Sequence, residues 1–151
     1  MSEEKVKVKV THLTKKFGDL LVLDDISFNV REGEFLCIVG PTGCGKTTFL
    51  NSLTKLYDIT AGEILVNGEP VDLKKHNIAY IFQEYSTFPW LKVEENIRYG
   101  LKLKKLPEDV IRERTDEVIR MVGLEEFRNY YPDQLSASML QRVVIARAFA
   151  V

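Results

Sequence analysis

Cysteine and histidine are scarce in this chain of 151 residues, which contains two of each. Cys37 and Cys44 lie close together, without the further cysteines that a disulfide framework or a metal site requires, so two free thiols are expected. His12 and His76 have no candidate ligand partners nearby in the sequence. Both histidines are therefore interpreted as surface residues.

An excess of one charge and a long hydrophobic run are also missing. The chain has 21 basic and 22 acidic residues, a net charge of -1, which argues against neutralising the many phosphates of a nucleic acid but not against binding one phosphorylated ligand. No segment approaches the roughly 20 apolar residues of a membrane-spanning helix. The opening ten residues lack the apolar centre of a signal peptide. These absences predict a cytoplasmic protein.

Short strand patterns dominate the first half of the chain. Valine alternates with lysine over residues 5–10, the period of a half-buried strand. Residues 35–39 are apolar on both faces, which predicts a central strand of a parallel sheet. Asn67-Gly68 joins two short strands and is a strong hairpin signal. The predicted strands cover 6–10, 20–23, 26–30, 35–39, 62–66, the region of Val71, and 78–82.

Helical patterns follow Pro89. Helices are predicted over 93–103 and 108–122, and in the second of these Ile111, Val118 and Val122 share one face. Pro107 near its start and Gly123 after its end fit the preferences of helix termini. Shorter helices are expected over 46–56 and up to residue 150. The order is strands first, then a loop with its helix, then a helical block.

The segment that follows the apolar run 35–39 matches G-x-x-x-x-G-K-[ST] in full. Its glycines let successive main-chain N–H groups point at an anion, and the following helix adds its positive end. Lys46 can reach the β- and γ-phosphates of ATP, and the Thr47 hydroxyl can hold Mg²⁺. The Cys44 thiol receives no chemical role. The predicted nucleotide-binding residues here are Gly40, Pro41, Thr42, Gly43, Cys44, Gly45, Lys46, Thr47 and Thr48.

Three further motifs stand on either side of this loop: Lys16-Phe17-Gly18 before it, and Phe82 to Leu91 and Leu135 to Arg142 after it. With the glycine-rich loop they resemble the ATP-binding subunit of an ABC transporter, and the second motif is most similar to importers of nitrate, sulfonate or taurine. The resemblance implies an α/β fold, with a P-loop NTPase core, an N-terminal antiparallel β subdomain and a helical subdomain. It also implies a β-rich core over about 1–90, a helical subdomain over about 91–135 and a signature helix over 136–151.

The same resemblance gives roles to several side chains outside the loop. Phe17 stands where the family stacks an aromatic ring on adenine, although the residue alone also fits a core position. Gln83 matches the glutamine that touches Mg²⁺ or its water and senses the transmembrane partner. Tyr85, Phe88 and Trp90 either line the groove that receives a helix of the membrane subunit or are core aromatics.

The motif at Leu135 departs from the family pattern LSGGQ. Ser136 matches the serine that reaches the γ-phosphate of ATP held by a second nucleotide-binding subunit. Ala137 and Ser138 replace the two glycines, and their side chains would obstruct a close approach to phosphate. An ordinary serine-capped helix is the alternative interpretation of this segment.

Two acidic residues of such an ATPase have no match in this sequence. No aspartate follows four apolar residues after Thr47, and Asp133 follows no predicted strand. The resemblance places the Walker B aspartate, catalytic glutamate and switch histidine beyond Val151. The chain is therefore expected to be the N-terminal part of a longer module, with an incomplete core sheet. We expect little ATP hydrolysis by this chain alone.

The sequence thus favours the MgATP-binding component of an importer for a small anionic solute. The implied partners are transmembrane permease subunits and a second nucleotide-binding subunit, with no nucleic acid. The implied location is the cytoplasmic side of the cell membrane, at its inner face. A small P-loop kinase and a non-hydrolysing nucleotide-binding module remain as alternatives.

Overall fold

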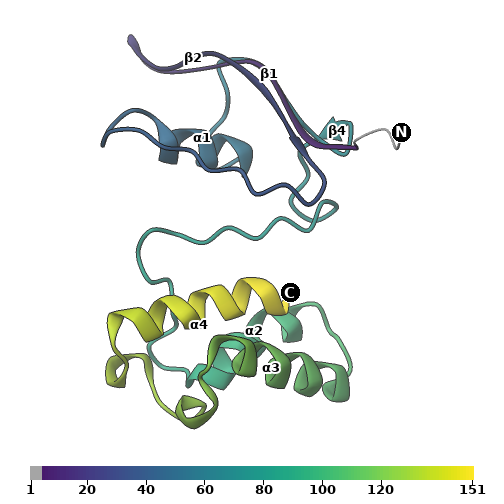
Figure 1. Ribbon diagram of the computed structural model, residues 1–151, viewed down its shortest axis with the longest axis vertical. Coiled ribbons are helices and arrows are strands. Elements are labelled where there is room, and N and C mark those ends of the chain that lie inside the picture. Colours follow the sequence, from purple (N-terminus) through teal and green to yellow (C-terminus); the bar gives the residue numbers. More distant parts are fainter. Residues whose placement is uncertain (1–4) are drawn as a thin grey trace. The chain divides into compact units, whose positions relative to one another are not determined.

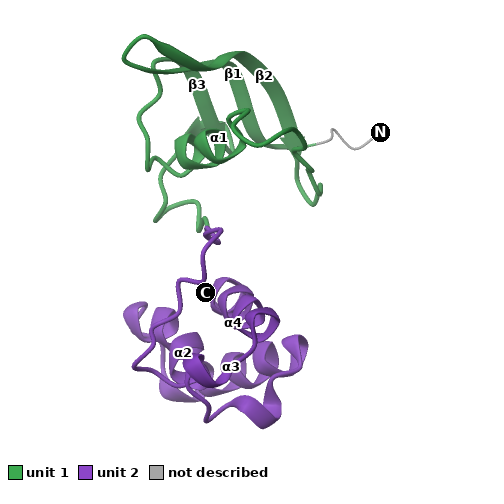
Figure 2. Cartoon of the chain, turned by 90° about the vertical axis from the view of Figure 1, so that its left-hand side faces the viewer, with its two compact units in different colours: residues 1–78 green, residues 79–151 purple. Residues whose placement is uncertain are grey.

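The computed structural model describes residues 5–151. The first four residues of the predicted N-terminal part lie outside this range. The chain divides into two compact units, residues 1–78 and 79–151 (Figure 2).

A four-stranded antiparallel sheet with the order β2-β1-β3-β4 forms the frame of the first unit. Figure 2 shows β3, β1 and β2 side by side, and Figure 1 shows α1 on one side of the sheet. Its strands are β1 (Val6–Phe17), β2 (Leu20–Arg31), β3 (Ala61–Val66) and β4 (Glu69–Pro70). β1 pairs with both β2 and β3. The predicted hairpin at Asn67-Gly68 is confirmed, because both residues have the positive φ (53° and 79°) that a tight hairpin turn requires.

The core of this unit lies between the sheet and helix α1 (Lys46–Leu53). The helix contributes Phe49, whose ring lies 5.5 Å from that of Phe28 on β2. The helix is three residues shorter than predicted, since Lys55 takes a left-handed conformation (φ 54°) just after it. The buried apolar residues are Val10, Leu13, Leu23, Phe49, Ile64, Val66 and Val71.

The prediction of buried strands at 35–39 and 78–82 is wrong. Neither segment forms a strand, and Phe35 and Val39 are 93% and 83% exposed. A parallel strand is stable only through hydrogen bonds to neighbouring strands. Among the described residues every paired strand belongs to the antiparallel sheet, so 35–39 has no partner. The α/β class with an antiparallel sheet and a helical part is confirmed.

This exposed apolar segment leads to a prediction about association. Phe35, Leu36, Ile38 and Val39 are all exposed, and an extended apolar segment without a partner is a template for other chains. Burying each large side chain contributes about 1.5–3 kcal/mol. We therefore expect the 151-residue chain to self-associate as its concentration rises, measured by sedimentation velocity. A chain carrying both Phe35→Ser and Val39→Ser should stay dispersed; a single monomeric species of the unchanged chain at every concentration would contradict this prediction.

The interpretation of both histidines as surface residues is correct for His12 and wrong for His76. The His76 side chain is only 3% exposed, and its Nδ1 accepts a hydrogen bond of 3.1 Å from the Asp72 N–H. The Asp72 carboxylate in turn accepts the N–H groups of Lys75 and Lys74, which lower the pKa of that carboxyl. This turn fixes His76 inside the unit, and no periodicity in the sequence predicts it.

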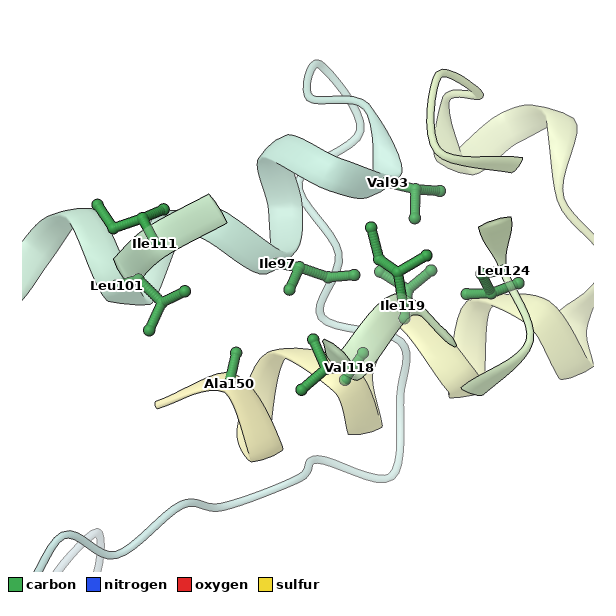
Figure 3. Packing of buried hydrophobic residues seen from close by; sticks show 10 residues of the cluster. Val93, Ile97, Leu101, Ile111, Val118, Ile119, Leu124 and Ala150 are labelled. Carbon is green, nitrogen blue, oxygen red and sulfur yellow. The ribbon is translucent and has the colours of Figure 1, made fainter. Parts of the chain in front are cut away.

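The second unit is helical and has its own core (Figure 3). The helices are α2 (Val93–Leu103), α3 (Glu108–Val122) and α4 (Ala137–Ala150), with short 3-10 turns η1 (Glu125–Phe127) and η2 (Pro132–Gln134). The predicted bounds of α2 and α3 are confirmed. Gly123 ends α3 in the left-handed region at φ 67°. None of the described helices is long and apolar enough to cross a membrane.

Candidate nucleotide-binding site

The loop of residues 40–45 turns sharply before α1 because two of its glycines adopt positive φ. Gly43 has φ 82° and Gly45 has φ 100°, values that residues with a Cβ rarely take. A Cβ at Gly45 would also lie 2.9 Å from Leu23 Cδ2 and 3.1 Å from the Val22 carbonyl oxygen. The motif glycine at this position therefore allows the loop to pack closely against β2.

Helix α1 presents its N-terminus to the loop without a capping side chain. Gly45 is the N-cap residue, no side chain accepts from the first turn, and no acidic residue lies in that turn. The first N–H groups of a helix have no partner within the helix, and the helix dipole makes this end positive. The main chain at Lys46, Thr47 and Thr48 is therefore suited to an anion.

The Lys46 side chain folds back over the loop. Its Nζ donates hydrogen bonds of 2.7 Å to the carbonyl oxygens of Gly40 and Pro41, and lies 3.6 Å from Cys44 Sγ. The ammonium is the only charged group among residues 40–48, and this segment contains no carboxylate. An ammonium group held by two carbonyls can exchange them for phosphate oxygens, which bind it more strongly.

This set of donors fits a polyphosphate and Mg²⁺ together. Main-chain N–H groups and one ammonium bind phosphate oxygens, while the Thr47 hydroxyl is an oxygen ligand that Mg²⁺ accepts. The described residues contain no group of three histidine, cysteine or acidic side chains that could hold a metal alone. Magnesium commonly takes one or two protein oxygens and completes its shell with substrate phosphates and water. The loop therefore fits the metal as a complex with a nucleotide.

Phe17, the predicted adenine contact, ends β1 and is 43% exposed, so it is not a core residue. Its ring meets Tyr57 edge to face at a centroid distance of 5.4 Å, and the Lys15 ammonium lies 4.6 Å from its centroid. Tyr57 follows α1, and nothing in its local sequence pattern pointed to this pairing. The three side chains form an exposed aromatic platform in the unit that carries the loop.

Gln83 and Ser136, the other predicted nucleotide contacts, belong to the second unit. Gln83 is exposed and lies in a bend rather than at the end of a strand. Ser136 is the N-cap of α4, where its Oγ accepts the Met139 N–H at 3.4 Å and lies 3.1 Å from Ser138 Oγ. Capping is thus a role that the structure gives to Ser136; its contact with a γ-phosphate stays a prediction.

The aromatic residues after Gln83 are arranged differently from a buried core. Trp90 is 70% exposed and Tyr85 is 45% exposed, while Phe88 is partly buried and its ring centroid lies 4.6 Å from that of Tyr99. The core interpretation is therefore wrong for Tyr85 and Trp90. These two side chains are available to a partner.

Asn96 has a structural role that the sequence pattern did not predict. It is fully buried on α2, and its Oδ1 accepts the Phe88 N–H at 2.8 Å. Its Nδ2 contacts the carbonyl oxygens of Phe88, Leu91 and Lys92 at 2.8–3.1 Å. An available signal was its position on the apolar face of the predicted helix, between Val93 and Leu101. Asn96 fixes the turn that enters α2.

The glycine loop, the lysine folded over it and the helix that follows define a P-loop nucleotide-binding protein. Residues 23–151 match the family described as ABC transporter, and the chain belongs to this family. The family match decides against the small P-loop kinase.

Similar proteins agree with this assignment. The spermidine/putrescine import ATP-binding protein PotA of Bacteroides thetaiotaomicron is 41% identical over 98% of this chain and 33% of its own length. The sulfate/thiosulfate import ATP-binding protein CysA of Synechocystis sp. is 38% identical over 97% of this chain and 42% of its own length. This chain thus spans less than half of either relative. The dimeric ATP-binding cassette MJ0796, bound to ADP and Pi, has a TM-score of 0.82 and 34% identity over 95% of this chain and 69% of that one.

Proposed function

We propose that this chain binds MgATP as part of the ATP-binding component of an ABC importer. The observation that carries the proposal is the loop before α1, where an uncapped helix N-terminus and the Lys46 ammonium face the same turn. Both groups attract phosphate oxygens. Membership of the ABC transporter family supports the choice of ATP among nucleotides.

In this proposal different groups of the first unit bind the phosphates, the metal and the base. Lys46 binds the β- and γ-phosphates, and the main-chain N–H groups at the start of α1 surround the phosphates. The Thr47 hydroxyl is the protein ligand of Mg²⁺, and Phe17 offers its exposed ring to adenine. Bound Mg²⁺ would neutralise charge on the phosphates.

The proposed partners are a second nucleotide-binding subunit and transmembrane permease subunits. The MJ0796 cassette is dimeric in its solved structure, which supports a dimeric arrangement for this chain. The exposed side chains of Tyr85 and Trp90 lie beside Gln83 in the sequence and suit an apolar helix of a membrane subunit. This arrangement would hold the chain on the cytoplasmic side of the membrane, at its inner face.

The proposed transported solute is a small anion such as nitrate, a sulfonate or taurine. This choice follows from the resemblance of residues 82–91. PotA is named for polyamines, which are cations, and CysA for sulfate and thiosulfate, which are anions. Relatives with 41% and 38% identity to this chain are thus named for solutes of opposite charge, and overall similarity does not select between them.

The experiment that tests nucleotide binding is a titration with a fluorescent ATP analogue, with and without Mg²⁺, followed by displacement with ATP and with AMP. We expect saturable binding that ATP reverses and AMP does not, because AMP lacks the β- and γ-phosphates. An analogue that AMP displaces as well as ATP would show binding through the base alone and would contradict the proposed role of the loop.

The Thr47→Val variant separates the metal from the phosphates. Valine has nearly the same shape as threonine but no hydroxyl, so one oxygen ligand of Mg²⁺ is lost while the loop keeps its glycines and Lys46. We expect affinity for the analogue to fall about tenfold with Mg²⁺, equivalent to one charge-assisted contact, and to change little without it. The Thr11→Val variant is the matched control, because Thr11 lies on β1 outside the loop. An equal loss with and without Mg²⁺ would contradict the assignment of Thr47 to the metal.

A further inference from the structure

The segment between Gln83 and α2 is held to the helical unit at two places. Asn96 of α2 binds the main chain from Phe88 to Lys92 through the hydrogen bonds described above. The second attachment comes from α4, where Arg147 lies opposite the earlier part of the same segment. Its Nη1 donates to the Ser86 carbonyl oxygen.

Arg147 also lies on the face of an aromatic ring. Its guanidinium carbon is 4.5 Å from the centroid of Phe88, which is within range of a cation–π interaction. The side chain is partly buried, and this burial lowers the pKa of Arg147 below its ordinary value. Among the described residues no carboxylate pairs with this guanidinium. Its hydrogen bond and its ring contact are both made with one short segment, and Tyr99 of α2 also interacts with it electrostatically.

Phe88 connects Arg147 to the exposed aromatic side chains of Tyr99 and Trp90. Its ring lies 4.6 Å from Tyr99 and 5.5 Å from Trp90, measured between centroids. One side of Phe88 thus meets Arg147, and Trp90 extends from the same cluster into solvent. The orientation of the exposed Trp90 side chain therefore depends on the partly buried Arg147.

We propose that Arg147 is a positioning residue that fixes the segment from Gln83 to Trp90 onto α4. Asn96 secures only the part from Phe88 onward, so without Arg147 the main chain from Gln83 to Ser86 is released. The meaning of this role for partner binding rests on the proposed function. If the exposed aromatics receive a membrane subunit, Arg147 joins that surface to the helix that begins at Ser136.

Arginine suits this role better than lysine. A guanidinium presents a flat face to Phe88 while an N–H at its edge reaches the Ser86 carbonyl. The ammonium of lysine can approach the ring or the carbonyl but does not offer a flat face and an edge together. The Arg147→Lys variant should therefore keep part of the attachment.

Hydrogen exchange of the whole chain, measured without nucleotide by mass spectrometry, tests the proposal. The amides of Phe88 and Leu91 donate to Asn96 Oδ1 and to the Phe88 carbonyl oxygen, so their exchange reports on this segment. Loss of one hydrogen bond and one cation–π contact should make these two amides exchange about tenfold faster in Arg147→Ala. Arg147→Lys should give an intermediate rate. Arg142→Ala is the control, because Arg142 lies on the same helix and contacts the Val122 carbonyl instead. The anisotropy of Trp90, the only tryptophan of the chain, should fall in parallel.

Two results would overturn the proposal. One is faster exchange along all of α2 and α4 in Arg147→Ala, which would assign Arg147 to the stability of the helical unit. The other is unchanged exchange of the Phe88 and Leu91 amides, together with unchanged anisotropy of Trp90, in both Arg147 variants. If Arg147→Ala does not fold, Arg147→Lys compared with Arg142→Lys decides the question. Because no nucleotide is present, failure of ATP binding leaves the outcome unaffected.

Discussion

Replacing Lys46 by alanine should weaken nucleotide binding more than any other single change in the loop. Lys46 is its only charged side chain, and its ammonium already lies over the turn, held by the carbonyl oxygens of Gly40 and Pro41. A charge-assisted hydrogen bond contributes about 1.5–3 kcal/mol, so removal of the ammonium should lower the affinity by about one to two powers of ten. Titration of a fluorescent ATP analogue measures this change.

Lys9→Ala is the matched control for this experiment. Lys9 is an exposed lysine on β1 with the same charge and length, and it lies outside the loop. We expect Lys9→Ala to bind the analogue with unchanged affinity at moderate salt. Equal losses in the two variants would show a general effect of net charge, and unchanged affinity of a folded Lys46→Ala protein would refute the assignment of the loop.

Gly62→Ala should be the most destabilising glycine substitution in the first unit. Gly62 lies on β3 with φ 89°, and a Cβ there would be 2.2 Å from the His12 carbonyl oxygen and 2.6 Å from that of Thr11. These oxygens belong to the backbone of β1, so relief of the clash requires the two strands to separate. We expect a loss of about 3–5 kcal/mol in the free energy of unfolding of this unit, in the range of severe core substitutions.

Gly68→Ala isolates the part of this effect that comes from the backbone conformation alone. Gly68 also has positive φ (79°), but no atom lies within 4 Å of the position that its Cβ would take. Strain in the left-handed region alone costs about 1–2 kcal/mol. Urea unfolding, with hydrogen exchange of β1 amides as the local reporter, compares the two variants. Equal losses would show that the clash with the backbone of β1 adds nothing to the strain of positive φ, and would contradict this prediction.

The sequence predicted those parts of the fold that depend on local patterns. Helices α2 and α3 have the bounds that their periodicity and terminal residues indicated, and the Asn67-Gly68 turn forms the expected hairpin. The glycine loop was predictable for the same reason, because the positions of its glycines, Lys46 and Thr47 are fixed relative to one another by a few bonds. In each case neighbouring residues decide the conformation.

Features that depend on distant partners could not be predicted in this way. The apolar run 35–39 has the composition of a buried strand, but a parallel strand needs neighbours that composition does not supply. Arg147 reaches Ser86 across 61 positions in the sequence. The sequence around Arg147 and around Ser86 contains no pattern that indicates this contact.

The pairing of β1 with both of its neighbours has a consequence for the phosphate loop. The loop and α1 lie in the connection between β2 and β3, and both ends of that connection are attached to β1. Strand β1 thus holds both ends of the connection between β2 and β3, so this connection is a closed loop. The entropy cost of closing such a loop grows only slowly with the number of residues in it. Lengthening the connection is therefore a smaller perturbation than loosening β1, which would free both ends of the loop at once. Strand β4 pairs only with β3, so loosening β4 would leave both ends of the connection attached to β1.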